Sequence, residues 1–268
     1  MAALVRGDVP AIVVRGAYAP GNCRSLVARL YEQDLVDGLP RPGDSIEGRG
    51  EFERVDVGTS LGNIGGDPER FFAEAEATAR LFSRLFEGIP SPVECLYDTI
   101  TKVSPGKRAV TAFEPDGRRY GPAIFRCHMP HWGYPPHVDS VRKRTFRTEY
   151  QVHRFSCQLG GIILLQPPDK DTSTVDSLLF RKEWDHDTAR SEGHDFGDLS
   201  GFKRDAFYAY VERGGIEKYE LRLNEGDLYL FKSENVHEVP AFGGNRPRIV
   251  LATFFGYSPE EEEIFVWS

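Results

Sequence analysis

The segment YPPHVDSV, residues 134–141, contains a histidine and an aspartate two positions apart, and both residue types can bind a metal ion. Alternate residues of an extended strand point to the same side, so His137 and Asp139 can converge on one point. Imidazole and carboxylate groups are ligands that suit a divalent iron ion. A His-x-Asp pair alone is weak evidence, so the prediction of a metal site depends on a third ligand elsewhere in the chain.

His237 is the candidate for that third ligand, because it follows the strand-like segment GDLYLF within VHEV. Together with His137 and Asp139 it would bring two histidines and one carboxylate to one side of a metal ion. That arrangement leaves three coordination positions open for a bidentate ligand and dioxygen. Arg248 opens the next apolar segment, RIVLATFF, and its guanidinium could form a forked pair with a carboxylate.

The clearest helix among the supporting elements is predicted over residues 67–88. Asp67 can cap its N-terminus, Pro68 suits its first turn, and Gly88 suits its C-terminal stop. A helix is also predicted over residues 21–38, whereas residues 39–66 are predicted to be mostly loop. One face of the helix over 67–88 should back a sheet through Phe71, Ala75, Thr78, Phe82 and Leu85.

Short strands are predicted at residues 10–16 and then from about residue 94 onward. Residues 153–166 end in a continuous apolar run and residues 248–257 form another strand, while 218–231 reads as a hairpin around an Asn-Glu-Gly-Asp turn. Many strands joined by turns predict an α+β, mainly β, fold with a double-sheet jelly-roll core and flanking N-terminal helices.

The chain of 268 residues is predicted to form one domain. Residues 1–93 would support a jelly-roll core at 94–258, and the long polar segment near 167–215 would be a surface excursion or a lid. The net charge of −8 argues against a nucleic-acid surface. The basic run VRKRTFR, residues 141–147, is either a solvated loop or an attraction for an anionic substrate.

Four scattered cysteines without a CxxC motif predict reduced thiols and a cytoplasmic chain. No segment reads as a signal peptide or as a membrane span. The predicted partner is therefore a small-molecule substrate, with neither nucleic acid nor membrane, and a homodimer stays open.

The pattern of a His-x-Asp pair, a distant histidine after GDLYLF and an arginine before IVL resembles the Fe(II)/2-oxoglutarate-dependent dioxygenases. The match covers residues 125–257, about half of the chain. The segments LGGIILLQPPDK and PRIVLATFFGYSP are similar to a small-molecule branch that includes N-succinyl amino acid hydroxylases and hapalindole-type halogenases. The resemblance implies a double-stranded β-helix, which is a cupin-like jelly roll, with Fe(II) bound by His137, Asp139 and His237.

The resemblance also implies 2-oxoglutarate as cosubstrate, dioxygen as oxidant, and an arginine that binds the distal carboxylate of 2-oxoglutarate. Arg248 is preferred because it directly precedes the apolar strand, as in the family's usual pattern. Arg246 is a rival, since it lies two residues away and the spacing between histidine and arginine varies within the family.

Asp139 bears on the type of reaction, because halogenases of this family carry Gly or Ala in place of the carboxylate. Retention of Asp139 implies hydroxylation of an unactivated C–H bond in an amino-acid derivative or a natural-product intermediate of secondary metabolism. Succinate and carbon dioxide would be the coproducts. Desaturation, ring formation and epimerisation stay open, as do a peptide or protein hydroxylase and a cupin-like metal-binding protein without oxygenase activity.

Five further residues are weaker candidates for the substrate pocket. Trp132 and Tyr134 could form its walls, and His131 borders the His-x-Asp pair. Arg126 could meet an anionic substrate or form a surface ion pair, and His153 could lie near the cosubstrate or be a satisfied core histidine.

A zinc site at Cys127, His128 and His131 is disfavoured, because the chain has no second ligand pair at zinc-site spacing. The pair Gly160–Gly161 lacks the lysine and hydroxyl of a phosphate loop, so it predicts close backbone packing instead.

Overall fold

The computed structural model describes residues 1–36, 54–143, 147–169, 174–183 and 204–268. The helices are α1 (Ala2–Arg6), α2 (Pro20–Glu32), α3 (Leu61–Ile64), α4 (Pro68–Leu85), α5 (Pro92–Lys102), the 3-10 helix η1 (Gln151–Arg154) and α7 (Arg204–Gly214). The strands are β1 (Ala11–Val14), β2 (Arg54–Val57), β3 (Arg108–Thr111), β4 (Ile124–His128), β5 (Tyr134–His137), β6 (Cys157–Gln166), β7 (Ser177–Glu183), β8 (Lys218–Leu221), β9 (Leu228–Phe231), β10 (Asn235–Val239), β11 (Arg248–Tyr257) and β12 (Glu263–Trp267).

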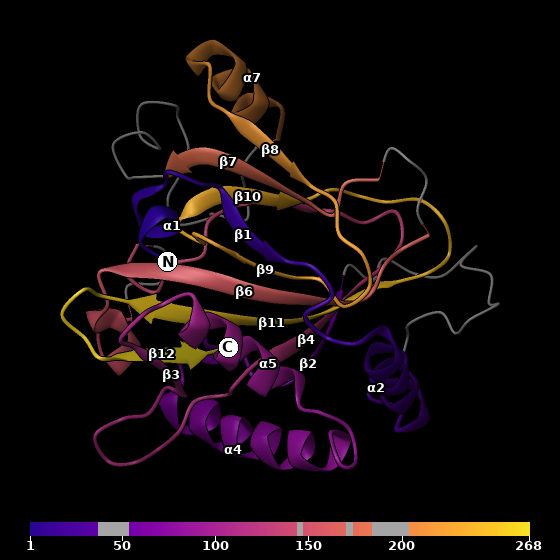
Figure 1. Cartoon of the computed structure of the whole chain (residues 1–268), viewed down its shortest axis with the longest axis vertical. Helices are drawn as coiled ribbons and strands as arrows, with labels where there is room; N and C mark the ends of the chain where they lie inside the picture. The colour runs from indigo at the N-terminus through magenta and orange to yellow at the C-terminus, as the bar shows by residue number, and fades with distance from the viewer. Residues whose placement is uncertain (37–53, 144–146, 170–173, 184–203) are drawn as a thin grey trace.

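The strands form two sheets (Figure 1). The larger sheet has eight strands in the order β1-β9-β6-β11-β12-β3, with β4 and β2 added beside the first half of β11. The smaller sheet has four strands in the order β5-β10-β7-β8. Every named pair is antiparallel except β12 with β3, which is parallel. The architecture is therefore mainly antiparallel β with helices added.

The central strand β11 is buried on both of its faces. Ile249, Leu251 and Phe255 pack into the apolar core that the helices share, whereas Val250 and Ala252 join a second cluster with residues of the smaller sheet. Side chains alternate along a strand, so a strand with both faces covered needs apolar residues at nearly every position. This explains the continuous apolar runs that the sequence shows at β6 and β11.

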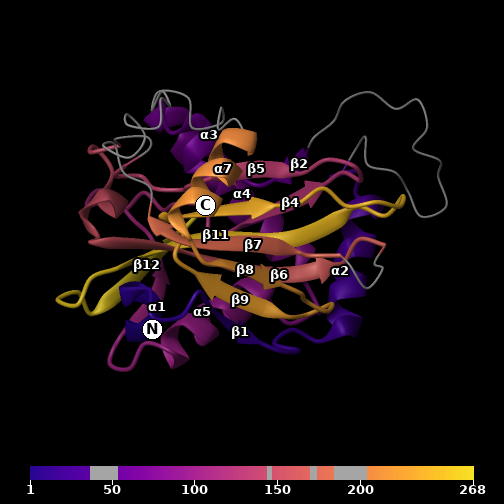
Figure 2. The same cartoon turned by 90° about the horizontal axis from the view of Figure 1, so that it is seen from above.

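Helices cover the outer faces of both sheets (Figures 1 and 2). Buried apolar residues of α2, α4 and α5 belong to the core cluster beneath the larger sheet. On the opposite side, α7 packs Phe207 and Val211 against Leu178 and Phe180 of β7. Within the described ranges, no helix combines the length and the apolar character that crossing a membrane requires.

Helix α4 confirms the prediction for residues 67–88. The side chain of Asp67 accepts a hydrogen bond from the backbone N–H of Arg70, and Pro68 occupies the first helical position. Gly88 has a positive φ of 73° just after the helix ends, a conformation that glycine adopts without strain. All five residues of the predicted core-facing side are buried: Phe71, Ala75, Thr78, Phe82 and Leu85.

The prediction of strands from about residue 94 is wrong at its start. Residues 92–102 form helix α5 rather than the first of the strands, because Ser91 caps the helix through the N–H of Glu94 and Pro92 opens it. Residues 39–53 of the segment predicted to be mostly loop lie outside the described residues, and residues 54–66 contain β2 and α3 joined by short loops. β2 exists because β4 offers it an antiparallel partner, which the local sequence does not reveal.

The hairpin predicted over residues 218–231 is also wrong, because its two arms belong to different sheets. β8 pairs with β7 in the smaller sheet, whereas β9 pairs with β1 and β6 in the larger one. Asp176 accepts a hydrogen bond from Leu223 N, and Asp227 accepts others from the backbone N–H groups of Gly16 and Asn224. These hydrogen bonds fix residues 222–227 in a connection that runs from one sheet to the other, instead of in a tight hairpin turn.

The polar segment near 167–215 is not one continuous excursion. Residues 177–183 form β7, which pairs with both β10 and β8, and residues 204–214 form α7. The stretch WDHDTARSEGHDFGD lies outside the described residues. The prediction of a lid or a surface excursion falls mainly on residues 184–203, which lie outside the described part of the chain.

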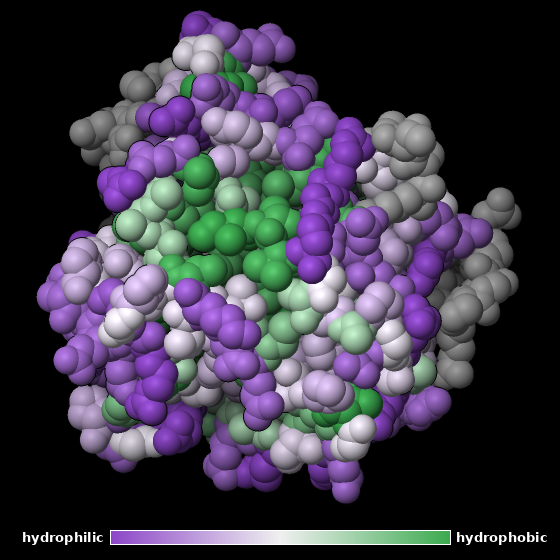
Figure 3. Space-filling view, in the orientation of Figure 1, coloured by the Kyte–Doolittle hydropathy of each residue, from purple (hydrophilic) through white to green (hydrophobic). Residues whose placement is uncertain are grey.

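An apolar area occupies the middle of the face on which β1 lies, and hydrophilic side chains surround it (Figure 3). β1 is the edge strand of the larger sheet, and each of its four residues is half-buried. Its short length limits the row of unpaired backbone groups that an edge strand presents.

The cysteines at positions 23, 95, 127 and 157 are all free thiols, as expected. Burial raises the pKa of Cys23 and of Cys157 to about 12. Thiolate is the reactive form, so these two side chains are inert at neutral pH.

Candidate metal centre

Strands β5 and β10 bring the three predicted ligands together. His137 and His237 are direct cross-strand partners in the smaller sheet, and Asp139 follows His137 by two residues. One Asp139 oxygen, Oδ2, lies 3.5 Å from Nε2 of His137 and 3.4 Å from Nε2 of His237. All three candidate ligand atoms lie within 4.8 Å of one another. Two imidazoles and one carboxylate on one side of a point form the donor set that non-haem iron(II) takes.

Backbone carbonyl groups orient both histidine rings. Nδ1 of His137 lies 2.7 Å from the carbonyl oxygen of Pro135, and Nδ1 of His237 lies 2.9 Å from that of Asn235. A ring that donates its Nδ1–H to a carbonyl keeps the lone pair of Nε2 free for a metal ion. The two rings therefore present Nε2 toward Asp139 in the tautomer that metal binding needs.

Ring contacts with other residues of the site support both histidines. The Tyr134 ring packs edge-on against His137 at 4.4 Å, and Phe231 packs against His237 at 4.8 Å. Phe231 has room because its cross-strand neighbour is Gly160, where an added Cβ would approach the Phe231 ring to 2.4 Å. This close approach confirms the packing role predicted for the glycine pair.

The protonation states of the ligands also suit a cation. Burial, assisted by the neighbouring His237, lowers the pKa of His137 to about 4. Burial opposes the ionisation of Asp139, but the neighbouring side chains of His137 and His237 outweigh it and hold its pKa well below the usual value. At neutral pH His137 is a neutral donor and Asp139 is an anion, as divalent metal binding requires.

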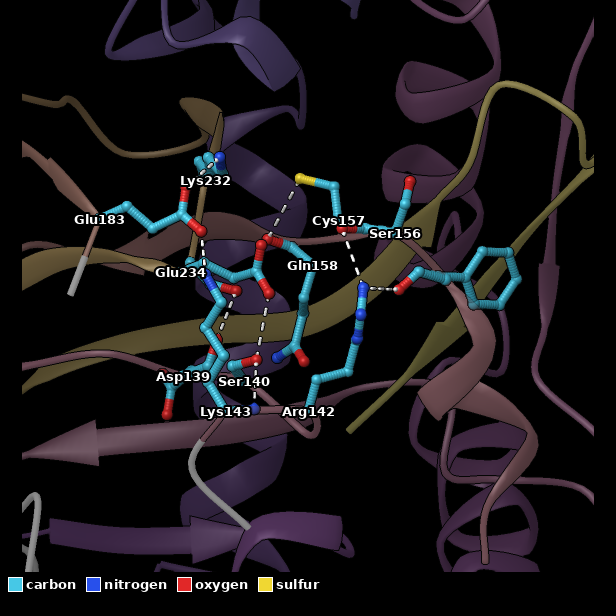
Figure 4. A network of polar contacts seen from close by, with 12 residues as sticks. Asp139, Ser140, Arg142, Lys143, Ser156, Cys157, Gln158, Glu183, Lys232 and Glu234 are labelled. Atoms are coloured by element: carbon cyan, nitrogen blue, oxygen red, sulfur yellow. Dashed lines mark hydrogen bonds and ion pairs between the residues drawn. The ribbon is translucent and has the colours of Figure 1, made fainter. Parts of the chain in front are cut away.

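The backbone at Asp139 is held by a polar network (Figure 4). Asp139 N–H donates to the carbonyl of Ser233 at 2.9 Å, and Ser233 Oγ donates back to the carbonyl of Asp139 at 3.0 Å. Ser140 Oγ donates to the buried carboxylate of Glu234 and accepts from the N–H of Lys143. The network ties the segment after β5 to the segment before β10, so two of the ligand-bearing segments are joined outside the site.

A cavity of about 50 Å³ is lined by the three residues, and we call it the metal cavity. The smaller sheet contributes His137 and His237, and the larger sheet contributes alternate residues of β11, among them Arg248, Val250 and Phe254. A second pocket adjoins it and is lined by Ser60, Leu61, Asn63, Gln158 and Trp267 among others; we call it the outer pocket. The two share Arg54, Arg126, Tyr134, Asp139 and Phe254.

Arg248 and Arg246, the two candidates for the carboxylate clamp, lie in different places. Arg248 is 1% exposed and lines the metal cavity, and its Nε and Nη2 atoms have no hydrogen-bond partner among the described residues. Arg246 instead lines a pocket beside α2, and its backbone N–H donates to Asp169. A buried guanidinium with free donors is costly unless a ligand satisfies it, which makes Arg248 the better fit for a carboxylate.

The five weaker candidates for the substrate pocket also lie in different places, and only some of them line the metal cavity. Tyr134 and Arg126 line the metal cavity, whereas His131, Trp132 and His153 do not. His131 is exposed, Trp132 packs at the edge of the main apolar core, and His153 lies in η1. The structure therefore brings together two of the five.

Sequence reasoning missed Arg54, Tyr229 and Phe254 as cavity residues. Tyr229 and Phe254 could have been predicted from the alternation of side chains along a strand. Each of them alternates with core-facing residues on a strand that borders the site. Arg54 carried no such signal, since β2 was not predicted.

The zinc and basic-run hypotheses receive no support. Cys127 belongs to the apolar core, whereas its neighbour His128 lines the metal cavity on the other face of β4. In the basic run, Arg142 donates to the carbonyls of Phe155 and Ser156, and Lys143 pairs with Glu183. Residues 144–146 lie outside the described part of the chain.

Solved structures share this fold. The crystal structure of an N-substituted L-amino acid dioxygenase from Burkholderia ambifaria AMMD has a TM-score of 0.62 and 16% identity, covering 100% of this chain and 89% of that chain. The same enzyme in complex with alpha-KG has a TM-score of 0.57 with the same identity and coverage. At this identity the likeness establishes the fold alone. No curated protein sequence matches the chain.

The fold, the three-residue group and the family match together place the chain among the Fe(II)/2-oxoglutarate-dependent oxygenases. The family is the one described as carrier-protein-independent halogenase WelO5, whose profile matches residues 1–268, and the chain belongs to it. This match confirms the resemblance to the branch that contains hapalindole-type halogenases.

Proposed function

We propose that this protein is an Fe(II)/2-oxoglutarate-dependent oxygenase that hydroxylates an unactivated C–H bond of a small molecule. One observation carries the proposal: the ligand atoms of His137, Asp139 and His237 converge in the same cavity as the buried, unsatisfied guanidinium of Arg248. A metal-binding protein without oxygenase activity has no use for that arginine. We further propose that the two facing sheets form a double-stranded β-helix in one domain.

Each residue has a defined task in this proposal. His137 and His237 donate Nε2 to iron, Asp139 donates a carboxylate oxygen, and Arg248 pairs with the distal carboxylate of 2-oxoglutarate. When bound, iron and 2-oxoglutarate supply the oxidising power for C–H cleavage, with succinate and carbon dioxide as coproducts. The protein's own contribution is to hold these groups in register, to keep His137 neutral, and to limit the access of water with the ring of Tyr134.

Halogenation is the second candidate, because the family description names a halogenase. Asp139 supports hydroxylation instead, since its carboxylate is directed between the two histidines and would occupy the position that a halide needs. Assays of any substrate should therefore include chloride and bromide, and analyse hydroxylated and halogenated products together.

The first test is an anaerobic titration of the metal-free protein with Fe(II) and 2-oxoglutarate. A visible charge-transfer absorption band from chelated 2-oxoglutarate is the expected result, and succinate release would then guide substrate screening. Absence of the band in folded protein that binds iron would contradict the proposal and favour a metal-binding protein without oxygenase activity.

The polar network around Asp139 gives a further prediction. Replacing Ser233 by alanine removes one of the two hydrogen bonds that fix the Asp139 backbone, so Fe(II) binding should weaken by about tenfold. The matched control is Ser83→Ala, which removes a hydroxyl–carbonyl bond on the exposed side of α4. Anaerobic metal titration of both variants, with melting temperatures of the metal-free proteins, would check this. Equal metal affinities would show that the bond serves folding alone.

A further inference from the structure

Three arginine side chains line the metal cavity from the larger sheet. Arg54 of β2, Arg126 of β4 and Arg248 of β11 come from adjacent strands, and His128 is the register partner of both Arg54 and Arg248. Burial, assisted by these three guanidinium groups, holds the pKa of His128 well below its ordinary value. This side of the cavity is therefore cationic, and its histidine is neutral.

Two of the three arginines have an anionic partner assigned to them. Arg54 forms an ion pair with Asp56, with Nε 2.8 Å from Oδ1 and a hydrogen bond of 2.9 Å from Nη2 to Oδ2, while its Nη1 has no hydrogen-bond partner among the described residues. Arg248 takes the cosubstrate carboxylate under the proposed function, on which the present inference rests. Arg126 is the guanidinium that remains.

The surroundings of Arg126 favour binding of an anionic group that belongs to a ligand. Its Nε is buried without a hydrogen-bond partner in the described part of the chain, and its guanidinium carbon lies 6.0 Å from the Phe254 ring centre. Burial and the nearby Arg54 lower its pKa, and the influence of Asp56 and Asp139 does not offset them. A half-buried cation that is not fully compensated can pair with an incoming carboxylate through charge-assisted hydrogen bonds.

An anion bound at Arg126 would lie apart from the 2-oxoglutarate carboxylate at Arg248, because the two arginines line different parts of the site. Arg126 lines both the metal cavity and the outer pocket, and it shares this double position with Asp139. The outer pocket adds the apolar side chains of Leu61 and Trp267 and the amide of Asn63. A molecule with one carboxylate and an apolar body would fit this mixture of groups next to the metal ligands.

We propose that Arg126 binds a carboxylate of the primary substrate, and that the substrate class is small carboxylic acids with an apolar body. The carboxylate anchors one end of the molecule at β4, and the apolar body lies against the packed rings of Phe254 and Trp267, with a C–H bond facing the metal side. Arg126 is in this view the residue that selects acids over their neutral analogues.

The test uses matched acids and amides with the anaerobic protein, Fe(II) and saturating 2-oxoglutarate. The probes are N-acetyl-L-leucine with N-acetyl-L-leucinamide, and 4-phenylbutanoate with 4-phenylbutanamide. Binding is followed by calorimetry and by changes in the charge-transfer band. We expect the wild-type protein to bind at least one acid about tenfold more tightly than its amide. Arg126→Met should remove that preference, and Arg126→Lys should keep part of it.

Arg108→Met is the matched control, because that guanidinium pairs with Glu263 on the surface and lines neither of the two pockets, and it should retain the preference for acids. Acids and amides that bind alike, or no binding of either, would overturn the assignment of a carboxylate subsite. Loss of the band in Arg126→Met alone would instead assign Arg126 to 2-oxoglutarate, and would overturn it too. A wild-type protein without the band would contradict the proposed function itself, and the inference would fall with it.

Discussion

Replacement of Asp139 by alanine is expected to lower hydroxylation at least about a hundredfold. The change removes the one anionic group between His137 and His237, so iron would be held by two neutral ligands and would bind more weakly. It also leaves an open position on the metal, which chloride could occupy. The measurement is product analysis by mass spectrometry in the presence of chloride, alongside Fe(II) titration of the variant.

Asp116→Ala is a suitable control, because that carboxylate is exposed and its ion pair with Arg118 lies on the surface. It should leave iron affinity and product formation unchanged. Hydroxylation at the wild-type rate by Asp139→Ala would refute the ligand assignment. A chlorinated product from that variant would show that the carboxylate decides between oxygen and halogen transfer.

The second large effect is expected at Arg248, where alanine should weaken 2-oxoglutarate binding on the order of 10- to 100-fold. The two buried guanidinium nitrogens without partners are the donors that a distal carboxylate would satisfy. Lysine should recover only part of the affinity, because an ammonium group cannot form the two-pronged pair. Titration of the charge-transfer band with 2-oxoglutarate measures the effect directly.

Arg246→Ala is the matched control for this prediction, since Arg246 lies beside α2 and outside the metal cavity. It should change 2-oxoglutarate affinity little. The reverse order of effects would move the clamp to Arg246. Melting of the metal-free proteins separates folding from binding: removing the unpaired buried charge of Arg248 should not lower stability in the absence of cosubstrate.

Parts of the site were predictable because they depend on short-range rules. The alternation of side chains along a strand was enough to pair His137 with Asp139, and the same rule explains why Arg248 faces the cavity while Ile249 faces the core. The cap at Asp67 and the spacing of apolar residues were enough to place α4 and its buried face. His237 was chosen because it follows the segment GDLYLF, and the resemblance implied its role as a ligand, but its position opposite His137 is visible only in the structure.

The errors arose where distant pairing decides local structure. The alternating residues of β8 and β9 fit a hairpin equally well, and only their partners β7 and β6 place them in different sheets. β2 became a strand because β4 was available to it, and Arg54 entered the cavity as a result. Neither pairing can be recognised from the nearby sequence. The group of arginines that lines the metal cavity (Arg54, Arg126 and Arg248) could therefore be predicted only in part.

The facing positions of His137 and His237 have a consequence for chain entropy. The two residues are about 100 positions apart in the sequence, and a metal ion bound by both would act as a removable cross-link between β5 and β10. Chelation would release that long loop without breaking a covalent bond, so amide hydrogens of the smaller sheet should exchange faster in the metal-free protein. The supply of iron would thus govern the lifetime of the folded sheet as well as the chemistry it supports.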